Sequence, residues 1–266
     1  MKVKRCRKPA RRGFGEILLA VFILSVAGAV SVDARSAESA GAGHSVTTHT
    51  MKQDGRTLAY TATAGFIPLS DKDMGSPAGE IFFVFYRKND DREDVNRPVT
   101  FAFNGGPGAA SMYLHLAALG PKTIPRSADG TALLPPPYTL QDNPNTLLDF
   151  TDLVFIDPIG TGYSRAAQGV DPRRFWGVRE DVASITDFVF RFLTEQGRMQ
   201  SPVFIAGESY GGVRGAGLAR SLQDGGLYPV GLVMISPALD LQNIQWSALG
   251  DRAMVLSLPS YAAAAW

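Results

Sequence analysis

The sequence contains a single cysteine, Cys6, and only three histidines, His44, His49 and His115. Cys6 lies in a basic N-terminal segment that we expect to be removed, so the mature chain would have no disulfide and would depend on a hydrophobic core for stability. The cysteine and the histidines do not cluster, and the sequence therefore predicts no metal site. A net charge of +1 without a basic stripe argues against a nucleic-acid-binding protein.

The first 34 residues have the layout of an export signal. A basic stretch ends at Arg12, an uncharged apolar run extends from Ile17 to Val30, and Val32-Asp33-Ala34 offers small residues for cleavage after Ala34. The apolar run is shorter than the roughly 18 residues that a membrane-spanning helix needs. The sequence therefore predicts a periplasmic or secreted protein that has left the membrane after cleavage; an uncleaved anchor is the alternative.

The remaining chain divides into a leader and one domain. Residues 35–50 are rich in Ser, Ala, Gly and Thr and predict a flexible leader, whereas residues 51–266 predict a partial α/β domain. Apolar or β-branched runs predict strands at 58–62, 80–87, 98–103, 153–156, 202–206 and 228–235. Helices are predicted at 109–119, from Asp171 to Leu193, and at 212–222.

This alternation of strands and helices predicts the fold class. We expect a mostly parallel sheet with helices on both faces, begun by an antiparallel hairpin of the first two strands. Residues 121–145 are rich in Pro, Asp and Asn and predict a long irregular segment. Residues 236–266 show no recognisable end of a domain.

The most informative motif is Gly207-Glu208-Ser209-Tyr210-Gly211, which fits the pattern G-x-S-x-G. It stands between a predicted buried strand and a predicted helix, which is the context of a nucleophile elbow. Small residues are needed there because the turn strains the serine backbone and brings neighbouring segments close. Ser209 is therefore the candidate nucleophile.

Two further glycine-rich turns follow predicted strands, at Asn104-Gly105-Gly106-Pro107-Gly108 and around Gly160-Thr161-Gly162. Because ligands bind at the carboxyl ends of parallel strands, we expect all three turns to meet at one rim of the sheet. The first turn lacks the Gly-Lys-Ser/Thr ending of a P-loop and the spacing of a dinucleotide fingerprint, so no cofactor is predicted. Backbone N–H groups aimed at a developing oxyanion fit these turns better.

The three motifs NGGPGAAS (104–111), GTGYS (160–164) and GESYGG (207–212) together resemble the serine carboxypeptidase family of α/β-hydrolases. The resemblance covers about residues 50–250 and is greatest to cysteine-poor bacterial members. It implies an α/β-hydrolase fold and an enzyme that releases C-terminal residues from peptides. In this family the catalytic acid and histidine lie downstream of an inserted lid region, so the resemblance implies a domain that is incomplete at its C-terminal side.

The resemblance also implies a role for each motif residue. Ser209 would attack the last peptide carbonyl, and the N–H groups of Gly106 and Tyr210 would form the oxyanion hole. The Asn104 side chain would hold the C-terminal carboxylate of the peptide, helped by a protonated Glu208. That last role agrees with elementary electrostatics, because two neighbouring carboxylates repel unless one of them is neutral.

No histidine follows Ser209 in the sequence. Asp240 is the best-placed acid, although a turn or cap role suits it equally, and His115 is the one histidine near a motif. Removing the histidine of a serine-protease triad costs on the order of 10⁶ in kcat, so the chain as given is predicted to be nearly inactive. Two alternatives remain open: a non-catalytic chain that binds peptide ends, and an esterase or acyltransferase on the same fold.

Overall fold

The computed structural model describes residues 43–71, 75–89, 96–127, 135–240 and 251–266. The predicted export signal and the first part of the predicted leader lie outside these ranges. Within them, no helix is both long enough and apolar enough to cross a membrane.

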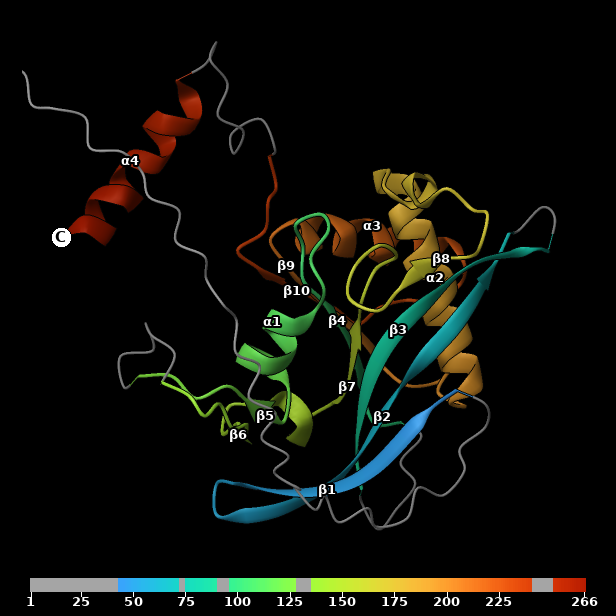
Figure 1. Ribbon diagram of the computed structural model, residues 1–266, viewed down its shortest axis with the longest axis horizontal. Coiled ribbons are helices and arrows are strands. Elements are labelled where there is room, and N and C mark those ends of the chain that lie inside the picture. The colour runs from blue at the N-terminus through green and yellow to red at the C-terminus, as the bar shows by residue number, and fades with distance from the viewer. Residues whose placement is uncertain (1–42, 72–74, 90–95, 128–134, 241–250) are drawn as a thin grey trace, which may run out of the picture. The chain divides into compact units, whose positions relative to one another are not determined.

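The described residues form one mixed sheet of eight strands and one small two-stranded sheet (Figure 1). The large sheet has the strand order β1-β2-β3-β7-β4-β9-β10, and β8 pairs with β3. The strands are β1 Ser45–Gln53, β2 Arg56–Ser70, β3 Pro77–Lys88, β4 Val99–Phe103, β5 Lys122–Thr123, β6 Gln141–Asp142, β7 Asp152–Ile156, β8 Arg165–Ala166, β9 Val203–Glu208 and β10 Gly231–Ile235. Strands β7, β4, β9 and β10 are parallel, and β2 pairs antiparallel with β3, as the sequence predicts. Strand β1 adds a further antiparallel pairing to β2.

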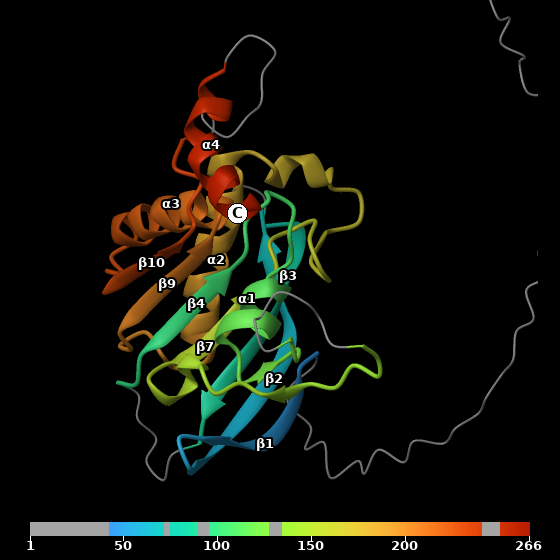
Figure 2. The same cartoon turned by 90° about the vertical axis from the view of Figure 1, so that its left-hand side faces the viewer.

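The helices and helical turns of the described residues have the following bounds. They are α1 Met112–Leu114, the π-helical turn η1 His115–Leu119, the 3-10 turns η2 Leu147–Asp149 and η3 Pro172–Phe175, and the α-helices α2 Val178–Glu195, α3 Tyr210–Asp224 and α4 Arg252–Ala265. Helices α2 and α3 cover one face of the sheet and α1 with η1 covers the other, which confirms the predicted fold class (Figure 2).

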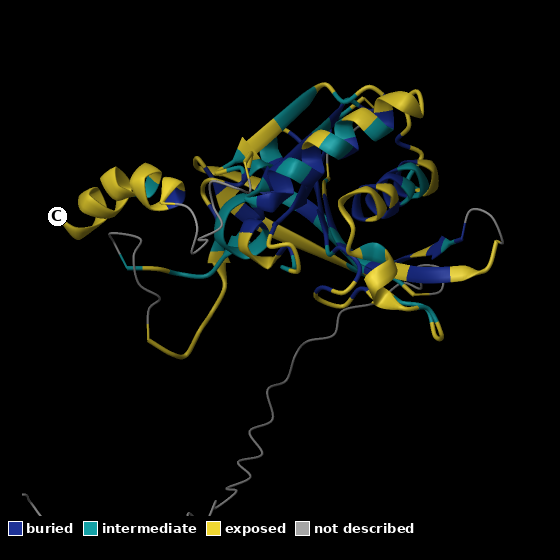
Figure 3. Ribbon diagram, turned by 90° about the horizontal axis from the view of Figure 1, so that it is seen from above, coloured by how far each residue is buried: buried dark blue, intermediate teal, exposed yellow. Residues whose placement is uncertain are grey.

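Two separate hydrophobic clusters fill these two faces (Figure 3). Strand β7 shows how the strands serve both clusters: Val154 and Ile156 join the α2–α3 cluster, while Leu153 and Phe155 join the α1 cluster. This alternation follows from the two-residue period of a strand. The parallel pairing of β4 with β7 and with β9 places the carboxyl ends of these three strands side by side.

A buried network of ion pairs and hydrogen bonds around Asp152 lies at the amino ends of β4 and β7. Its carboxylate accepts from Arg97 Nε and Arg198 Nη1, both at 2.8 Å, and from the Lys88 N–H at 3.1 Å. Arg198 also donates to the Arg97 carbonyl oxygen at 2.6 Å. A buried carboxylate persists only when it is paired and hydrogen-bonded in this way.

The first strands differ from the prediction in two respects. Residues 45–50, predicted to belong to a flexible leader, form most of β1, where Ser45 pairs with Ala64. Strand β2, predicted only at 58–62, continues through Pro68 to Ser70. Proline is tolerated there because β1 pairs with β2 only as far as Ala64, so the missing N–H breaks no ladder on that side.

The helix boundaries differ as well. The helix predicted at 109–119 is a single α-turn that continues as the π-helical η1. The helix predicted to begin at Asp171 is divided: Asp171 caps η3, and α2 begins only at Val178, after Gly177. Residues 121–145 contain the paired strands β5 and β6, which the sequence did not predict. In the unassigned tail, α4 occupies Arg252–Ala265.

Candidate active site

Ser209 stands at the tight turn between β9 and α3, with φ 58° and ψ −122°. A non-glycine residue with this backbone is strained, and its conformation is held here by the Ser209 N–H donating to the Ile235 carbonyl oxygen at 2.9 Å. A Cβ on Gly207 would lie 2.1 Å from the Gly211 carbonyl oxygen, so only glycine fits that position. The strand, strained serine and helix form the predicted nucleophile elbow.

The loop after β4 lies directly against this elbow. A Cβ on Gly105 would lie 2.5 Å from the Tyr210 nitrogen and 2.7 Å from the Glu208 carbonyl oxygen. Gly106 follows with φ 101°, a conformation that favours glycine. Within the described residues, the N–H groups of Gly106 and Tyr210 donate to no main-chain acceptor in the turns and loops. Tyr210 is the first residue of α3, so its N–H has no acceptor within that helix either.

Asn104 and Glu208 meet beside the elbow. The Asn104 Nδ2 donates to Glu208 Oε2 at 3.0 Å, and the Asn104 Oδ1 accepts from the Leu114 N–H at 3.0 Å. These contacts fix the orientation of the amide and leave one Nδ2 hydrogen for a ligand, because an amide nitrogen carries two. Asn104 is buried and Glu208 is half-buried. The structure thus brings together the two residues that the sequence assigned to carboxylate binding.

The third glycine-rich turn, after β7, is organised by Asp157. Its Oδ1 accepts from the Ser111 N–H at 2.8 Å, and Ser164 Oγ donates to the Asp157 carbonyl oxygen at 2.5 Å. A Cβ on Gly162 would lie 1.8 Å from Asp157 Oδ2. Burial raises the pKa of Asp157, against the effect of the N–H groups of Ser111 and Tyr163. Asp157 therefore ties this turn to the start of α1.

The histidines do not meet Ser209 in the described residues. His115 Nε2 lies 2.6 Å from Tyr86 Oη, and its ring stacks on Phe155 at 4.5 Å between centroids. Burial lowers the pKa of His115 to about 4. His44, which lies in the predicted leader, is half-buried against Phe83. Exposed His49 contacts Thr47, and the candidate acid Asp240 lies exposed beyond β10.

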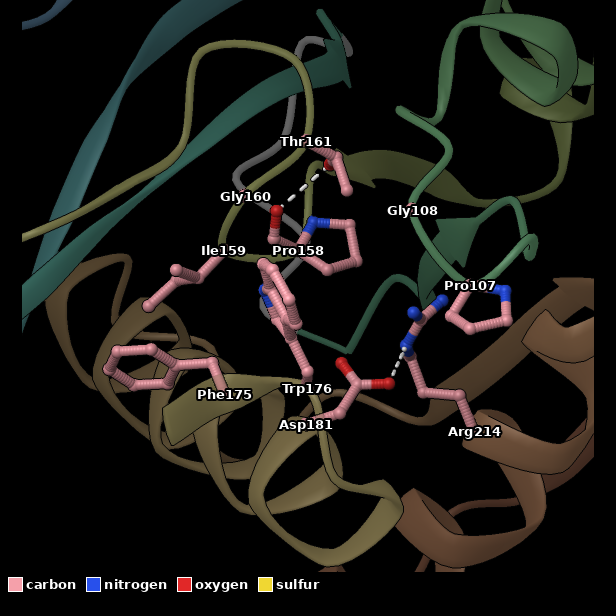
Figure 4. Close-up of a pocket in the computed structure, with 10 residues that line it drawn as sticks. All are labelled: Pro107, Gly108, Pro158, Ile159, Gly160, Thr161, Phe175, Trp176, Asp181 and Arg214. Atoms are coloured by element: carbon pink, nitrogen blue, oxygen red, sulfur yellow. Dashed lines mark hydrogen bonds and ion pairs between the residues drawn. The ribbon is translucent and has the colours of Figure 1, made fainter. Parts of the chain in front are cut away.

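A cavity of about 290 Å³ lies between the loop after β4, the turn after β7 and the η3–α2 segment, and the sequence did not predict it (Figure 4). Its walls are Pro107, Gly108, the turn 158–161, Phe175 and Trp176, and its base contains Asp181 and Arg214. Arg214 Nε donates to Asp181 Oδ2 at 2.9 Å. Burial raises the pKa of Asp181, and the Arg214 guanidinium opposes this shift.

Arg214 also contacts the loop after β4. Its Nη1 donates to the Asn104 carbonyl oxygen at 2.7 Å, and its guanidinium lies 5.3 Å from the Phe103 ring centroid and 5.1 Å from that of Tyr210. Only 1% of Arg214 is exposed. An arginine this deeply buried needs a carboxylate partner, which Asp181 supplies.

A strained serine between a parallel strand and a helix, at the carboxyl edge of a sheet covered on both faces, defines the α/β-hydrolase class. A crystal structure of a prohormone-processing carboxypeptidase from Saccharomyces cerevisiae has this fold. It superposes with a TM-score of 0.56 at 23% identity and covers 74% of this chain and 45% of that one.

Within that class, the chain belongs to the serine carboxypeptidase family, whose sequence profile matches residues 52–226. It is 33% identical to the pheromone-processing carboxypeptidase KEX1 of Saccharomyces cerevisiae over 161 residues, which are 56% of this chain and 20% of the relative. It is 30% identical to a carboxypeptidase Y homolog of Arthroderma benhamiae, covering 52% of this chain and 25% of that protein. It is also 30% identical to serine carboxypeptidase-like 36 of Arabidopsis thaliana, covering 52% and 27%.

The chain thus spans a fifth to about a quarter of these curated relatives. They are fungal and plant proteins and give no support to the bacterial type expected from the sequence. The family expected from the three motifs is confirmed.

Sequence reasoning found the elbow and the loop after β4 but missed the cavity. Phe175 and Trp176, which lie within the helix predicted from Asp171 to Leu193, line the cavity. No role was assigned to Asp181 or Arg214 from the sequence. The available signal was Arg214 among the small and apolar residues of the first turns of α3, since buried arginines are rare unless paired.

Proposed function

We propose that the whole protein is a serine-type carboxypeptidase that releases C-terminal residues from peptides through an acyl-enzyme on Ser209. The observation that carries this proposal is the Asn104–Glu208 pair, 3.0 Å apart, directly beside a strained serine. A hydrolase that cleaves within chains has no need of an amide and a carboxyl group placed to hold a free carboxylate. The family membership supports the same reaction class.

In the proposed reaction, Ser209 Oγ bonds to the carbonyl carbon of the last peptide bond and the C–N bond breaks. The hydroxyl proton passes to the leaving amine, and water then hydrolyses the ester. The N–H groups of Gly106 and Tyr210 are proposed to stabilise the oxyanion. Removing one such donor typically costs roughly 10²- to 10³-fold in kcat. The catalytic acid and base are not assigned to any described residue.

We propose Asn104 and Glu208 as the carboxylate-binding pair. The spare Nδ2 hydrogen of Asn104 donates to the peptide carboxylate, and a protonated Glu208 donates a second hydrogen bond. Ionised Glu208 would instead repel the peptide end.

A second candidate function is peptide-end binding without hydrolysis by this chain alone. It is favoured by the contacts of the histidines within the described residues, which go to Phe66, Thr47 and Tyr86 and not to Ser209. The layout of residues 1–34 supports the further proposal that the protein is exported to the periplasm or secreted, with peptide or protein C-termini as its ligands.

The test is to measure binding and hydrolysis of one blocked dipeptide, N-acetyl-Phe-Leu, as the free acid and as the amide, using the full chain. We expect the free acid to bind at least about tenfold more tightly, the order expected for one charge-assisted hydrogen bond. Glu208→Gln should retain binding, because a neutral side-chain amide can also donate a hydrogen bond to the peptide carboxylate. Equal affinity for acid and amide would overturn the carboxylate-binding role.

Hydrolysis separates the remaining possibilities. Release of leucine from the free acid alone supports the carboxypeptidase, and binding of the acid without release supports the binding-only function. Hydrolysis of the amide at the same rate as the acid would instead indicate a hydrolase of another specificity, such as an esterase.

A further inference from the structure

Arg214 occupies a place in α3 where packing alone favours an apolar side chain. It is almost completely buried, and its guanidinium lies over the rings of Phe103 and Tyr210. Asp181 of α2 is its charge partner, with Arg214 Nε and Asp181 Oδ2 2.9 Å apart (Figure 4). A buried ion pair is often no more stabilising than well-packed apolar side chains of similar volume. Stability alone therefore explains this pair poorly.

The other hydrogen bond of Arg214 is made to the main chain of the loop after β4. Its Nη1 donates to the Asn104 carbonyl oxygen at 2.7 Å. In the described turns and loops, no main-chain N–H donates to this oxygen, so an apolar residue in place of Arg214 would remove its donor. Buried carbonyl groups are nearly always hydrogen-bonded, because an unpaired one costs free energy. Arg214 thus satisfies the carbonyl at the point where the chain leaves β4.

The loop after β4 has little steric restraint of its own beyond this point. Asn104 is followed by Gly105 and Gly106, and Gly106 adopts φ 101°. Glycine has the widest choice of backbone conformations. At Gly105 it is required by the elbow, since a Cβ there would lie 2.5 Å from the Tyr210 nitrogen. A loop that needs glycine for this close approach depends on outside contacts for its conformation, and Arg214 supplies one of them.

The Asp181–Arg214 pair is bonded to the elbow as well. Tyr210 Oη donates to Asp181 Oδ2 at 3.3 Å, and Tyr210 directly follows Ser209. The pair therefore contacts both segments of the proposed site, the loop through the Asn104 carbonyl and the elbow through the Tyr210 side chain. Neither Asp181 nor Arg214 takes part in the contact between Asn104 and Glu208, so an effect of the pair on that contact passes through these other residues.

The main-chain carbonyl and the side chain of Asn104 extend from the same Cα. The side-chain amide contacts Glu208 Oε2 and the Leu114 N–H, both at 3.0 Å, while Arg214 holds the carbonyl. A shift of the main chain at Asn104 therefore moves the amide relative to Glu208. Because hydrogen bonds weaken steeply when distance and angle depart from their optimum, a small shift is enough to weaken a bond from the amide to a ligand.

We propose that Asp181 and Arg214 are positioning residues for the carboxylate-binding pair. Arg214 fixes the main chain of Asn104 and Asp181 fixes Arg214, so that the second Nδ2 hydrogen of Asn104 faces the carboxylate of the peptide. Neither Asp181 nor Arg214 touches the peptide in this proposal. The inference rests on the proposed function, because it requires that Asn104 itself binds the peptide end.

The test removes both charges at once, in the double variant Asp181→Asn, Arg214→Met. No buried charge is left unpaired, and the side-chain amide that replaces the Asp181 carboxylate still accepts from Tyr210, so the melting temperature should change little. Dissociation constants of N-acetyl-Phe-Leu and its amide are measured by calorimetry on the full chain carrying Ser209→Ala, so that no bound peptide is cleaved. We expect the preference for the acid to fall from about tenfold to about threefold or less, with the affinity for the amide unchanged.

Two comparisons separate positioning from a general structural role. The first adds the double variant to Asn104→Ala, which removes the side-chain amide but keeps the carbonyl to which Arg214 donates. If the pair acts through this amide, the acid preference is already low in Asn104→Ala and does not fall further. The second is the matched control Asp187→Asn, Arg191→Met, which makes the same two changes in another ion pair of α2, 2.9 Å long. It should leave the acid preference at about tenfold.

Thermal unfolding of each variant checks that it is folded. The inference is overturned if Asp181→Asn, Arg214→Met keeps the full acid preference, if it weakens acid and amide alike, or if it lowers the preference further in Asn104→Ala. If this variant does not fold, Asp181→Leu, Arg214→Met gives the same measurement with an apolar pair. In these cases a clear acid preference of the Ser209→Ala chain still supports the proposed function. If that chain binds acid and amide equally, the proposed function fails and the inference fails with it.

Discussion

Buried polar groups at the two ends of the central strands differ in how completely the protein hydrogen-bonds them. At the amino ends of β4 and β7, Asp152 accepts from Arg97, Arg198 and the Lys88 N–H. At the carboxyl ends, the contact with Glu208 uses only one of the two Nδ2 hydrogens of Asn104, and the backbone of Ser209 is strained. The same strands thus connect an end where polar groups are satisfied by the protein to an end where some are left for a ligand.

The comparison shows where stability and function are expected to separate. A saturated buried network rigidifies a fold, and loss of one member leaves the others uncompensated. A partly satisfied site is costly to maintain and is retained only where a ligand completes it. Changes at the amino ends should therefore affect unfolding, and changes at the carboxyl ends should affect binding.

The largest expected effect is that of Asp152→Asn. Removing this charge leaves Arg97 and Arg198 without their buried partner, and such losses cost roughly 3–5 kcal/mol of unfolding free energy. Urea denaturation measures the change. Glu208→Gln is the matched substitution at the other end of the sheet and should alter stability little. Equal losses for the two variants would show that the two ends do not differ in the way described.

A second expected effect concerns pH and the α1 face of the sheet. Burial lowers the pKa of His115 from 6.5 to about 4, so the folded state holds the neutral ring. The unfolded chain therefore binds the proton first, and stability that is complete above pH 6.5 falls as the pH drops toward 4. The loss amounts to about 3 kcal/mol.

Urea titrations at several pH values test this effect. The double variant His115→Phe, Tyr86→Phe removes the imidazole together with the hydroxyl that it contacts, and it should lack this part of the pH dependence. An unchanged slope between pH 6.5 and 4 in the double variant would contradict the assignment to His115.

The smallest of the three effects compares two glycines. A Cβ on Gly207 would lie 2.1 Å from the Gly211 carbonyl oxygen, which is backbone, whereas a Cβ on Gly177 would lie 2.0 Å from the end of the flexible Glu180 side chain. Gly207→Ala should therefore cost about 1–3 kcal/mol and displace Ser209. Gly177→Ala should cost much less, because Glu180 can rotate away. Similar melting temperatures for the two variants would show that the elbow can relax.

The sequence predicted the two parts of this site that are contiguous along the chain. Gly207 to Gly211 and Asn104 to Gly108 are contiguous motifs, and their glycines alone indicate tight turns. The cavity could not be predicted in this way, because Trp176, Asp181 and Arg214 come from three segments whose meeting depends on how α2 and α3 pack on the sheet. No spacing rule connects them.

The fold shows the same limit. Strand β1 has few apolar residues, and its Thr47, Thr48 and Thr50 are exposed, so its pairing with β2 stabilises a segment that its hydrophobicity does not reveal. The division between η3 and α2 depends on Gly177, which interrupts a pattern that is otherwise typical of one helix. Strand identity was predicted well in the core, where apolar runs are continuous.

The main-chain carbonyl of Asn104 accepts from Arg214, whereas its side-chain amide donates to Glu208. The loop after β4 therefore contacts both the Asp181–Arg214 pair and Glu208 through this one residue. Because Arg214 donates to the main-chain carbonyl of the residue whose side chain contacts Glu208, a change at the Asp181–Arg214 pair is expected to shift the Asn104 amide as well.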